Sequence, residues 1–241
     1  MTDVAFPVLT PDQIMAESFR IIDAEVGAHA FEALEWQVVR RLIHASGDLA
    51  LARLTHFQRD AARAGMRALQ AGRPIVTDVR MVASGIRKPE LQALGVTLHC
   101  FIDAPEVARL AQETGRTRSF CAMQKAVAEV GTAVYVIGNA PTALLALCTC
   151  VQQGLVTPAL VVAMPVGFVS VVESKEQALT LACPVITVRG RKGGSAVAAA
   201  TVNALLLMAR QEEGAPLNWG RAEAEKAARN PSADAVAGEQ T

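Results

Sequence analysis

The stretch Val136-Ile137-Gly138-Asn139-Ala140-Pro141-Thr142 ends an apolar run and begins a helical pattern. Two similar strand-to-helix turns follow it, at 164–168 and 189–195, each after a run rich in β-branched residues. Such turns build the edge of an open α/β sheet where the carboxyl ends of strands meet helix N-termini. Because unpaired N–H groups and the positive end of the helix dipole point to that edge, we expect it to bind an anionic ligand.

Short apolar runs alternate with helical patterns along most of the chain. The predicted strands are 50–53, 74–78, 97–102, 133–137, 159–163 and 185–189. The predicted helices are 11–26, 31–43, 57–71, 88–94, 104–114, 118–130, 141–153, 172–182 and 195–211, and several end at a glycine (Gly72, Gly95, Gly115, Gly154). This alternation predicts an α/β protein with a largely parallel sheet that is covered on both faces.

The domain organisation is read from length and composition. The 241 residues allow one large domain or two small ones, and we find neither an internal repeat nor an interior linker. After Glu213 alanine, glutamate, asparagine and glycine dominate, and apolar periodicity fades. We therefore expect a single domain over 1–225 and a mobile tail over 226–241.

Composition and charge exclude several classes of partner. The 23 basic and 23 acidic residues give zero formal net charge, so no global field attracts nucleic acid or an anionic membrane. We see no secretory leader and no apolar run of about 18 residues, which favours a cytoplasmic protein. The five cysteines lack CxxC spacing, and HExxH and EF-hand motifs are absent from the sequence, so we expect no metal site.

Among the four histidines, His44 has the context most suited to chemistry. We expect structural roles for His29 and His99, and His56 simply precedes a helix. Two arginines precede His44 and a Ser-Gly-Asp turn follows it. The arginines favour the neutral ring, whereas the helix end and a nearby carboxylate favour the protonated one, and both possibilities stay open. From pattern alone, a surface or capping role is more common for such a residue.

Two basic segments could hold an anion. Arg116-Thr117-Arg118-Ser119 precedes a helix, and its guanidinium groups suit carboxylates or phosphates. The alternative is a solvated helix start, although the helix dipole opposes a basic pair there. The segment 189–195 has the composition of a phosphate loop but not the GxxxxGK[ST] order, so a nucleotide-dependent enzyme is a weaker hypothesis. Acid-base work on an organic polyanion fits the residues better.

Six motifs in order carry a resemblance to a known family. They are 41–48, 77–86, 117–119, 137–142, 165–169 with 173–176, and 190–195. On these motifs, between about residues 10 and 210, the chain resembles the precorrin-8X methylmutases of cobalamin (vitamin B12) biosynthesis.

The resemblance implies a flavodoxin-like three-layer α/β/α fold, a homodimer, and an isomerase that needs no cofactor or metal. It implies that a methyl group moves between adjacent carbons of ring C of precorrin-8X to give hydrogenobyrinate, with His44 as the acid-base residue. By the same resemblance, the residues that hold this tetrapyrrole polycarboxylate are Ser18, Arg41, Ser84, Gly85, Arg116, Arg118, Asn139 and Lys192. We expect the metal-free substrate. The alternatives are a cobalt-precorrin-8 methylmutase of the anaerobic route and a non-catalytic tetrapyrrole carrier.

Overall fold

The computed structural model describes residues 9–211. The predicted tail over 226–241, and both ends of the predicted 1–225 domain, lie outside the described residues. The helices are α1 (Pro11–Val26), α2 (Ala33–Ser46), α3 (Leu51–Leu54), α4 (Ala61–Gln70), α5 (Arg80–Gly85), α6 (Lys88–Ala93), α7 (Pro105–Thr114), α8 (Arg118–Val130), α9 (Pro141–Gln152), α10 (Val171–Leu179) and α11 (Ser195–Ala209). The strands are β1 (Thr55–Gln58), β2 (Ile75–Thr77), β3 (Leu98–His99), β4 (Val134–Ile137), β5 (Leu160–Ala163) and β6 (Val185–Val188).

Within residues 9–211 the strands form one six-stranded sheet in the order β1-β6-β5-β4-β2-β3. All neighbours are parallel except β1, which pairs antiparallel with β6. Counted along the chain, the parallel strands lie in the order 2-1-3-4-5, which is that of flavodoxin-like sheets. The predicted flavodoxin-like fold is therefore confirmed. The strand order reverses between β2 and β4, so a ligand is expected at the carboxyl ends of these strands.

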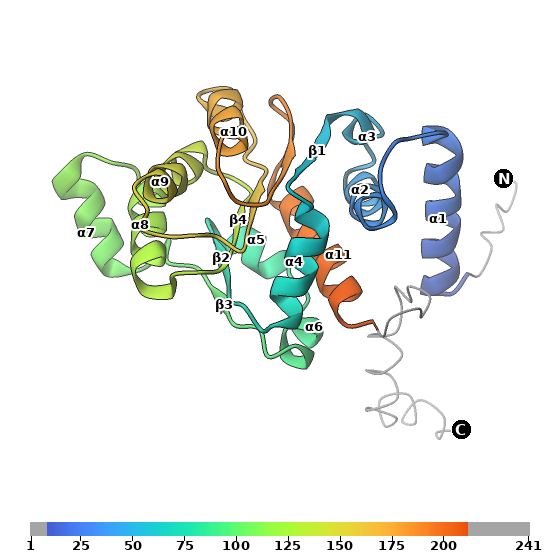
Figure 1. Cartoon of the computed structure of the whole chain (residues 1–241), viewed down its shortest axis with the longest axis horizontal. Helices are drawn as coiled ribbons and strands as arrows, with labels where there is room; N and C mark the ends of the chain where they lie inside the picture. Colours follow the sequence, from blue (N-terminus) through green and yellow to red (C-terminus); the bar gives the residue numbers. More distant parts are fainter. Residues whose placement is uncertain (1–8, 212–241) are drawn as a thin grey trace, which may run out of the picture.

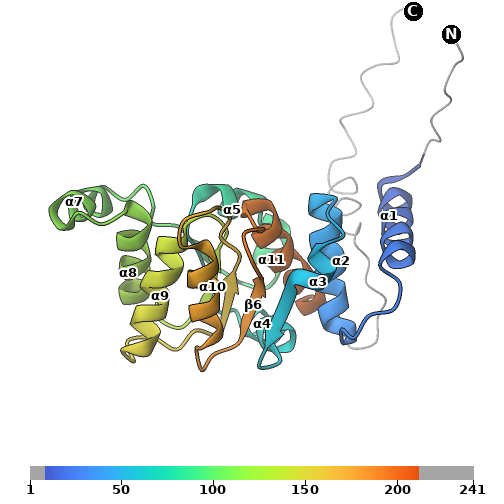
Figure 2. The ribbon, with the colours of Figure 1, turned by 90° about the horizontal axis from the view of Figure 1, so that it is seen from above.

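Helices cover both faces of the sheet, which confirms the three-layer architecture (Figure 2). Helices α2, α4, α5 and α6 surround α11 on one face, whereas α8, α9 and α10 pack in a row on the other. Side chains of successive residues along β4 point to opposite faces of the sheet, so the core has two parts. Val136 belongs to the part on the α11 face, and Ile137 belongs to the part on the α9 face. Residues 197–209 of α11 are all buried, which explains why this helix is apolar around its whole circumference.

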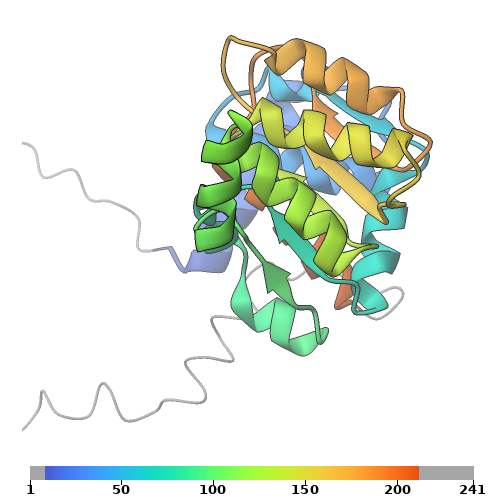
Figure 3. The same ribbon diagram turned by 90° about the vertical axis from the view of Figure 1, so that its left-hand side faces the viewer.

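Helices α7 and α1 lie at opposite ends of the long axis (Figure 1). Seen from the α7 end, α8, α9 and α10 lie side by side across one face of the sheet (Figure 3). At the other end, α1 packs on α2, outside the layer that α2 forms with α11. No helix of residues 9–211 is both long and apolar enough to cross a membrane.

Two sequence predictions of local structure are wrong. The predicted strand 50–53 contains most of α3, and the edge strand β1 replaces the start of the predicted helix 57–71. The Asp48 side chain accepts a hydrogen bond from Ala50 N at 3.0 Å and starts the helical turn. The strand that follows forms through its register with distant β6, a tertiary contact that a local pattern does not contain. The segment after β2, where the pattern predicts neither a helix nor a strand, contains the short helix α5.

Candidate active site

The backbone N–H groups of the turn between β4 and α9 donate hydrogen bonds to a carboxylate of the same chain. The carboxylate of Asp78, 2% exposed, follows β2 and accepts hydrogen bonds from three successive N–H groups: Gly138 (3.0 Å), Asn139 (2.9 Å) and Ala140 (2.7 Å). Burial raises the pKa of Asp78, and these hydrogen bonds oppose that shift. An internal carboxylate therefore satisfies the backbone donors of this turn, and an anion at this edge would have to bind other groups.

The loop between β6 and α11, residues 189–194, reaches the end of α2. Lys192 Nζ lies 2.6 Å from the Asp48 carboxylate, in the turn that follows α2. This ion pair lowers the pKa of Asp48. It also places the C-terminal end of α2, which carries His44, at the same edge of the sheet as the strand carboxyl ends.

His44 faces a groove between α1 and α2 with a volume of about 290 Å³. The groove is lined by Ser18, Ile21, Ile22, Glu25, Ile43, His44, Gly47 and Leu49. The imidazole meets the Phe19 ring edge-to-face, with centroids 5.7 Å apart. Burial lowers the pKa of His44, and the charge of Arg41 lowers it further. Both effects favour the neutral form of the imidazole.

Arg41 lies one helical turn before His44 and connects α2 to α1. Its guanidinium group is partly buried, with Nη1 3.1 Å from the sulfur of Met15. Burial lowers the pKa of Arg41, with a smaller contribution from Arg87, but a guanidinium group stays charged in proteins. The structure thus brings together Ser18, Arg41 and His44. Lys192 joins this group through its ion pair with Asp48, in the turn after α2.

Arg116, Arg118 and Asn139 form a second group elsewhere. Thr117 caps α8 by accepting from Phe120 N, and its hydroxyl donates to Thr142 Oγ1 at 2.8 Å, so the starts of α8 and α9 are linked. Both arginines and Asn139 are exposed. Helix α8 covers the face of the sheet opposite to α2 and lies toward the α7 end of the molecule (Figures 1 and 2). One chain therefore does not bring this group beside His44.

Ser84 and Gly85 lie at the end of α5, and the structure gives Gly85 a packing reason. A Cβ atom at this position would lie 2.8 Å from the Cβ of Ala199 on α11. The Gly85 carbonyl also accepts a hydrogen bond from the Asn203 side chain at 2.8 Å. Ser84 is exposed. A contact of either residue with substrate stays a prediction.

Within its quoted motifs, sequence reasoning missed the buried charged residues Asp78 and Lys175. Both stood inside quoted motifs, yet neither was assigned a role. For Asp78, the available signal was a charged residue directly after the apolar strand β2. For Lys175, it was a lysine beside apolar positions of a helical pattern. Such positions favour buried groups whose hydrogen bonds must be satisfied within the protein.

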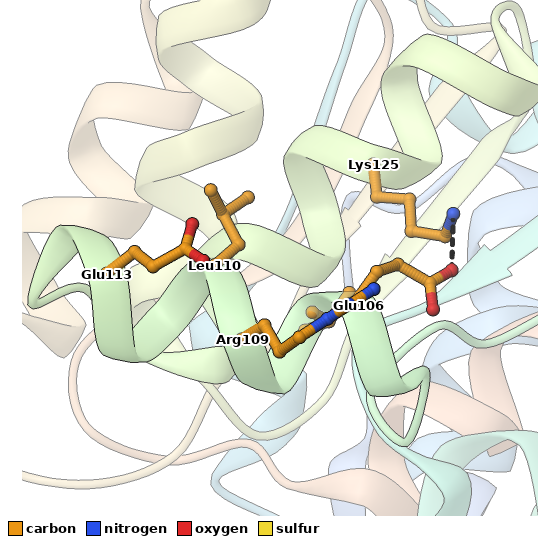
Figure 4. Close-up of a pocket in the computed structure, with 6 residues that line it drawn as sticks. Glu106, Arg109, Leu110, Glu113 and Lys125 are labelled. Carbon is orange, nitrogen blue, oxygen red and sulfur yellow. Dashed lines mark ion pairs between the residues drawn. The ribbon is translucent and has the colours of Figure 1, made fainter.

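A pocket of about 420 Å³ between α7 and α8 does not suit a polyanion (Figure 4). Its lining includes the carboxylates of Glu106 and Glu113. Lys125 is directed toward Glu106 and pairs with it at 2.7 Å, and Glu129 is a second carboxylate that pairs with this lysine. The His44 groove is the better candidate for the reaction.

The fold and the site together define a flavodoxin-like α/β protein with a histidine and basic groups around the carboxyl edge of its sheet. Residues 13–208 match the family described as precorrin-8X methylmutase. The chain belongs to this family, whose members are isomerases of cobalamin biosynthesis, and the predicted enzyme class, a methylmutase, is confirmed.

Curated relatives and a solved structure agree with this assignment. The chain is 41% identical to a cobalt-precorrin-8 methylmutase of Priestia megaterium, over 83% of this chain and 88% of the relative. It is also 41% identical to a precorrin-8X methylmutase of Pseudomonas aeruginosa, over 80% and 93%. The crystal structure of a precorrin-8X methylmutase from Thermus thermophilus is 43% identical, covers 81% of this chain and 96% of its own, and superposes with a TM-score of 0.75.

Proposed function

We propose that this chain converts precorrin-8X into hydrogenobyrinate by moving a methyl group between adjacent carbons of ring C, with His44 as the acid-base residue. The observation that carries the proposal is the position of His44. In a chain of the methylmutase family, this imidazole lies in a groove at the carboxyl edge of the sheet, beside the guanidinium group of Arg41.

The proton balance fits a single histidine. Migration breaks one bond between the methyl group and a ring carbon and forms another to the neighbouring carbon, so substrate and product are isomers. Any proton that His44 gives to the macrocycle must therefore return to it. General acid-base catalysis contributes about 10²–10⁴-fold, so orientation of the macrocycle supplies much of the remaining acceleration.

The carboxylate arms of the substrate would serve two purposes. They would pair with Arg41 and Lys192 near the His44 groove, with Ser18 as a further hydrogen-bonding group. They would also add negative charge close to the imidazole. Because nearby negative charge favours imidazolium, substrate binding would raise the pKa of His44 and prepare it to act as an acid.

We further propose a homodimer, in which Arg116 and Arg118 of a second copy complete the site. Within one chain these arginines lie toward the α7 end, whereas His44 lies on α2, next to α1 at the other end. Both groups nevertheless belong to elements that end or begin at the carboxyl edge. A two-fold arrangement would pair each group with its complement on the partner.

The substrate is proposed to be metal-free. The cobalt-precorrin-8 methylmutase of Priestia megaterium supports a second candidate, because it is as similar to this chain as the precorrin-8X methylmutase of Pseudomonas aeruginosa. Supplying the purified protein with each substrate in turn distinguishes the two. We expect faster turnover of precorrin-8X, and a preference for the cobalt form would overturn this choice.

Mixing the purified protein with precorrin-8X tests the proposal itself. We expect the absorbance spectrum to change to that of the product, whereas binding without conversion would support the carrier. A nucleotide-dependent enzyme predicts instead that ATP or NAD raises the melting temperature. Such a ligand at 100 times its Kd would add roughly 2.7 kcal/mol of stability, which a melting scan detects easily.

A further inference from the structure

Lys175 on α10 is the one buried lysine among residues 9–211, and the proposed reaction does not use it. Its residue is 0% exposed, and its Nζ donates to the carbonyls of Gly190 at 2.9 Å and Lys192 at 2.6 Å. Within the described residues, no carboxylate lies within ion-pair distance of this ammonium group. Burial lowers the pKa of Lys175 to about 8, so the charged form still dominates near neutral pH. The two carbonyls therefore solvate a buried cation.

The loop 189–194 is held against the segment between β5 and α10 at further points. The Arg191 carbonyl accepts from Gly167 N at 3.4 Å, and Gly194 N donates to the Met164 carbonyl at 2.9 Å. A Cβ atom on Gly193 would lie 2.5 Å from that same Met164 oxygen. The carbonyls of three successive residues, 190–192, thus all point to the α10 side of the loop.

Several backbone N–H groups of the same loop are available on the side that faces away from α10. Among residues 9–211, no acceptor is found for the N–H groups of Gly190, Arg191 and Gly193. Successive N–H groups that turn away from their carbonyls form a concave anion-binding surface. The Lys192 ammonium group contacts Asp48, four residues after His44, so this surface adjoins the end of α2.

We propose that Lys175 is a positioning residue for the substrate carboxylates: it holds the carbonyls of Gly190 and Lys192 inward, so that the loop offers its N–H groups and the Lys192 side chain to one acidic arm. This inference rests on the proposed function, since the arm belongs to the tetrapyrrole. Without the ammonium group the carbonyls would be buried and unpaired, which is unfavourable. Turned outward to water instead, they would repel the carboxylate that binds there.

The test is binding of hydrogenobyrinate to the whole protein, followed by titration, for Lys175→Met and for a control, Lys125→Met. Methionine keeps an unbranched side chain that is one atom shorter than lysine, and it donates no hydrogen bond. Lys125 is a lysine of α8 that pairs with Glu106 on α7 and with Glu129 on α8, outside the site. We expect Lys175→Met to raise the Kd and the KM about tenfold or more, with kcat changed less than about threefold, because a charge-assisted contact in binding is lost. Lys125→Met should match the wild type.

A double variant separates positioning from general destabilisation. If Lys175 acts through the loop that carries Lys192, then Lys175→Met should cost clearly less affinity in a Lys192→Met background than in the wild type. Equal losses in both backgrounds, or an unchanged Kd in the single variant, would overturn the inference.

Amide hydrogen exchange on the wild type tests whether the loop binds the ligand, even if Lys175→Met does not fold. Hydrogenobyrinate should slow exchange at residues 190–193, and unchanged exchange there on saturation would overturn the inference. The proposed function is judged separately, by turnover of precorrin-8X in the wild type. A protein that binds hydrogenobyrinate with a protected loop but does not convert precorrin-8X would refute the function and keep the anion site.

Discussion

At the imidazole of His44, burial and the charge of Arg41 act in the same direction, and both lower its pKa below the ordinary value of about 6.5. The neutral ring is a poor acid until negative charge arrives. In the proposed mechanism a polyanionic substrate would supply that charge, and its binding would then be coupled to protonation of His44. This coupling makes two predictions at the scale of single residues.

The first prediction concerns pH. Activity that needs imidazolium falls as pH rises through the pKa of His44, and kcat/KM reports this pKa in the free protein while kcat reports it in the complex. Because the substrate carboxylates raise the pKa of His44, the fall in kcat should occur at higher pH than the fall in kcat/KM. Profiles of both constants between pH 5 and about 9 check this. Coincident profiles would show that bound substrate does not influence the imidazole.

The second prediction concerns removal of the ring. His44→Ala should lower kcat about 10²–10⁴-fold, since the acid-base group is lost, and should leave the affinity for hydrogenobyrinate nearly unchanged. Turnover and product titration on the same preparation check it. The matched control is His99→Ala, a histidine on edge strand β3 whose Nε2 contacts Thr97 at 3.1 Å. Wild-type turnover by His44→Ala would refute the assignment.

At the scale of elements, the turn between β4 and α9 depends on Asp78. Its carboxylate satisfies three N–H groups at the point where the strand order reverses, and the N-terminus of α9 starts from this turn. The same arrangement in other flavodoxin-like proteins leaves such donors for a ligand. In this chain the donors hold β2 and the β4–α9 turn together, and external anions must bind at other turns.

This leads to a prediction about stability. Asp78→Ala should lower the free energy of unfolding by about 3 kcal/mol or more, because three N–H groups lose their partner and two of them, Gly138 and Ala140, belong to buried residues. Urea denaturation measures the change. Asp103→Ala, which removes an exposed ion pair with Arg80, should cost less than about 1 kcal/mol. Equal losses would mean that the buried hydrogen bonds contribute no more than a surface pair.

The elements also show what could be predicted from sequence. The parallel strands other than β3, and the ends of the helices before Gly72, Gly95, Gly115 and Gly154, were predicted closely, because apolar period and left-handed glycines are local signals. Strand β3 covers only two residues of the predicted 97–102. Strand β1 was missed, because its pairing with β6 joins segments far apart in sequence. Likewise, the partner of Asp78 lies 60 residues further along, so the motif contained the carboxylate but not its role.

At the scale of the whole molecule, the site residues predicted from the family resemblance divide into two groups. The order of the motifs along the chain does not give the distances between them in space. The sequence therefore could not show that α2 and α8 lie on opposite faces of the sheet. The groups around His44 and around Arg118 would meet only if a second copy supplies one of them, or if one macrocycle spans the whole edge. These two arrangements predict different behaviour of mixed variants.

Mixing two impaired variants tests the shared site. His44→Ala lacks the acid-base group, and Arg118→Ala should bind substrate more weakly, at least tenfold, because it loses a charge-assisted contact of about 1.5–3 kcal/mol. In a dimer that contains one chain of each kind, a shared site joins intact His44 from one chain to intact Arg118 from the other. The second site of that dimer lacks both.

Statistical exchange makes half of all dimers mixed, and each mixed dimer has one of its two sites intact. At low substrate concentration, where each variant alone is much slower than the wild type, activity should therefore recover to about a quarter of the wild-type value. Denaturing and refolding the mixture together allows the exchange, and refolding each variant alone is the control. If every site lies within one chain, the mixture would show no more activity than the two variants added together, because no chain in it carries both residues.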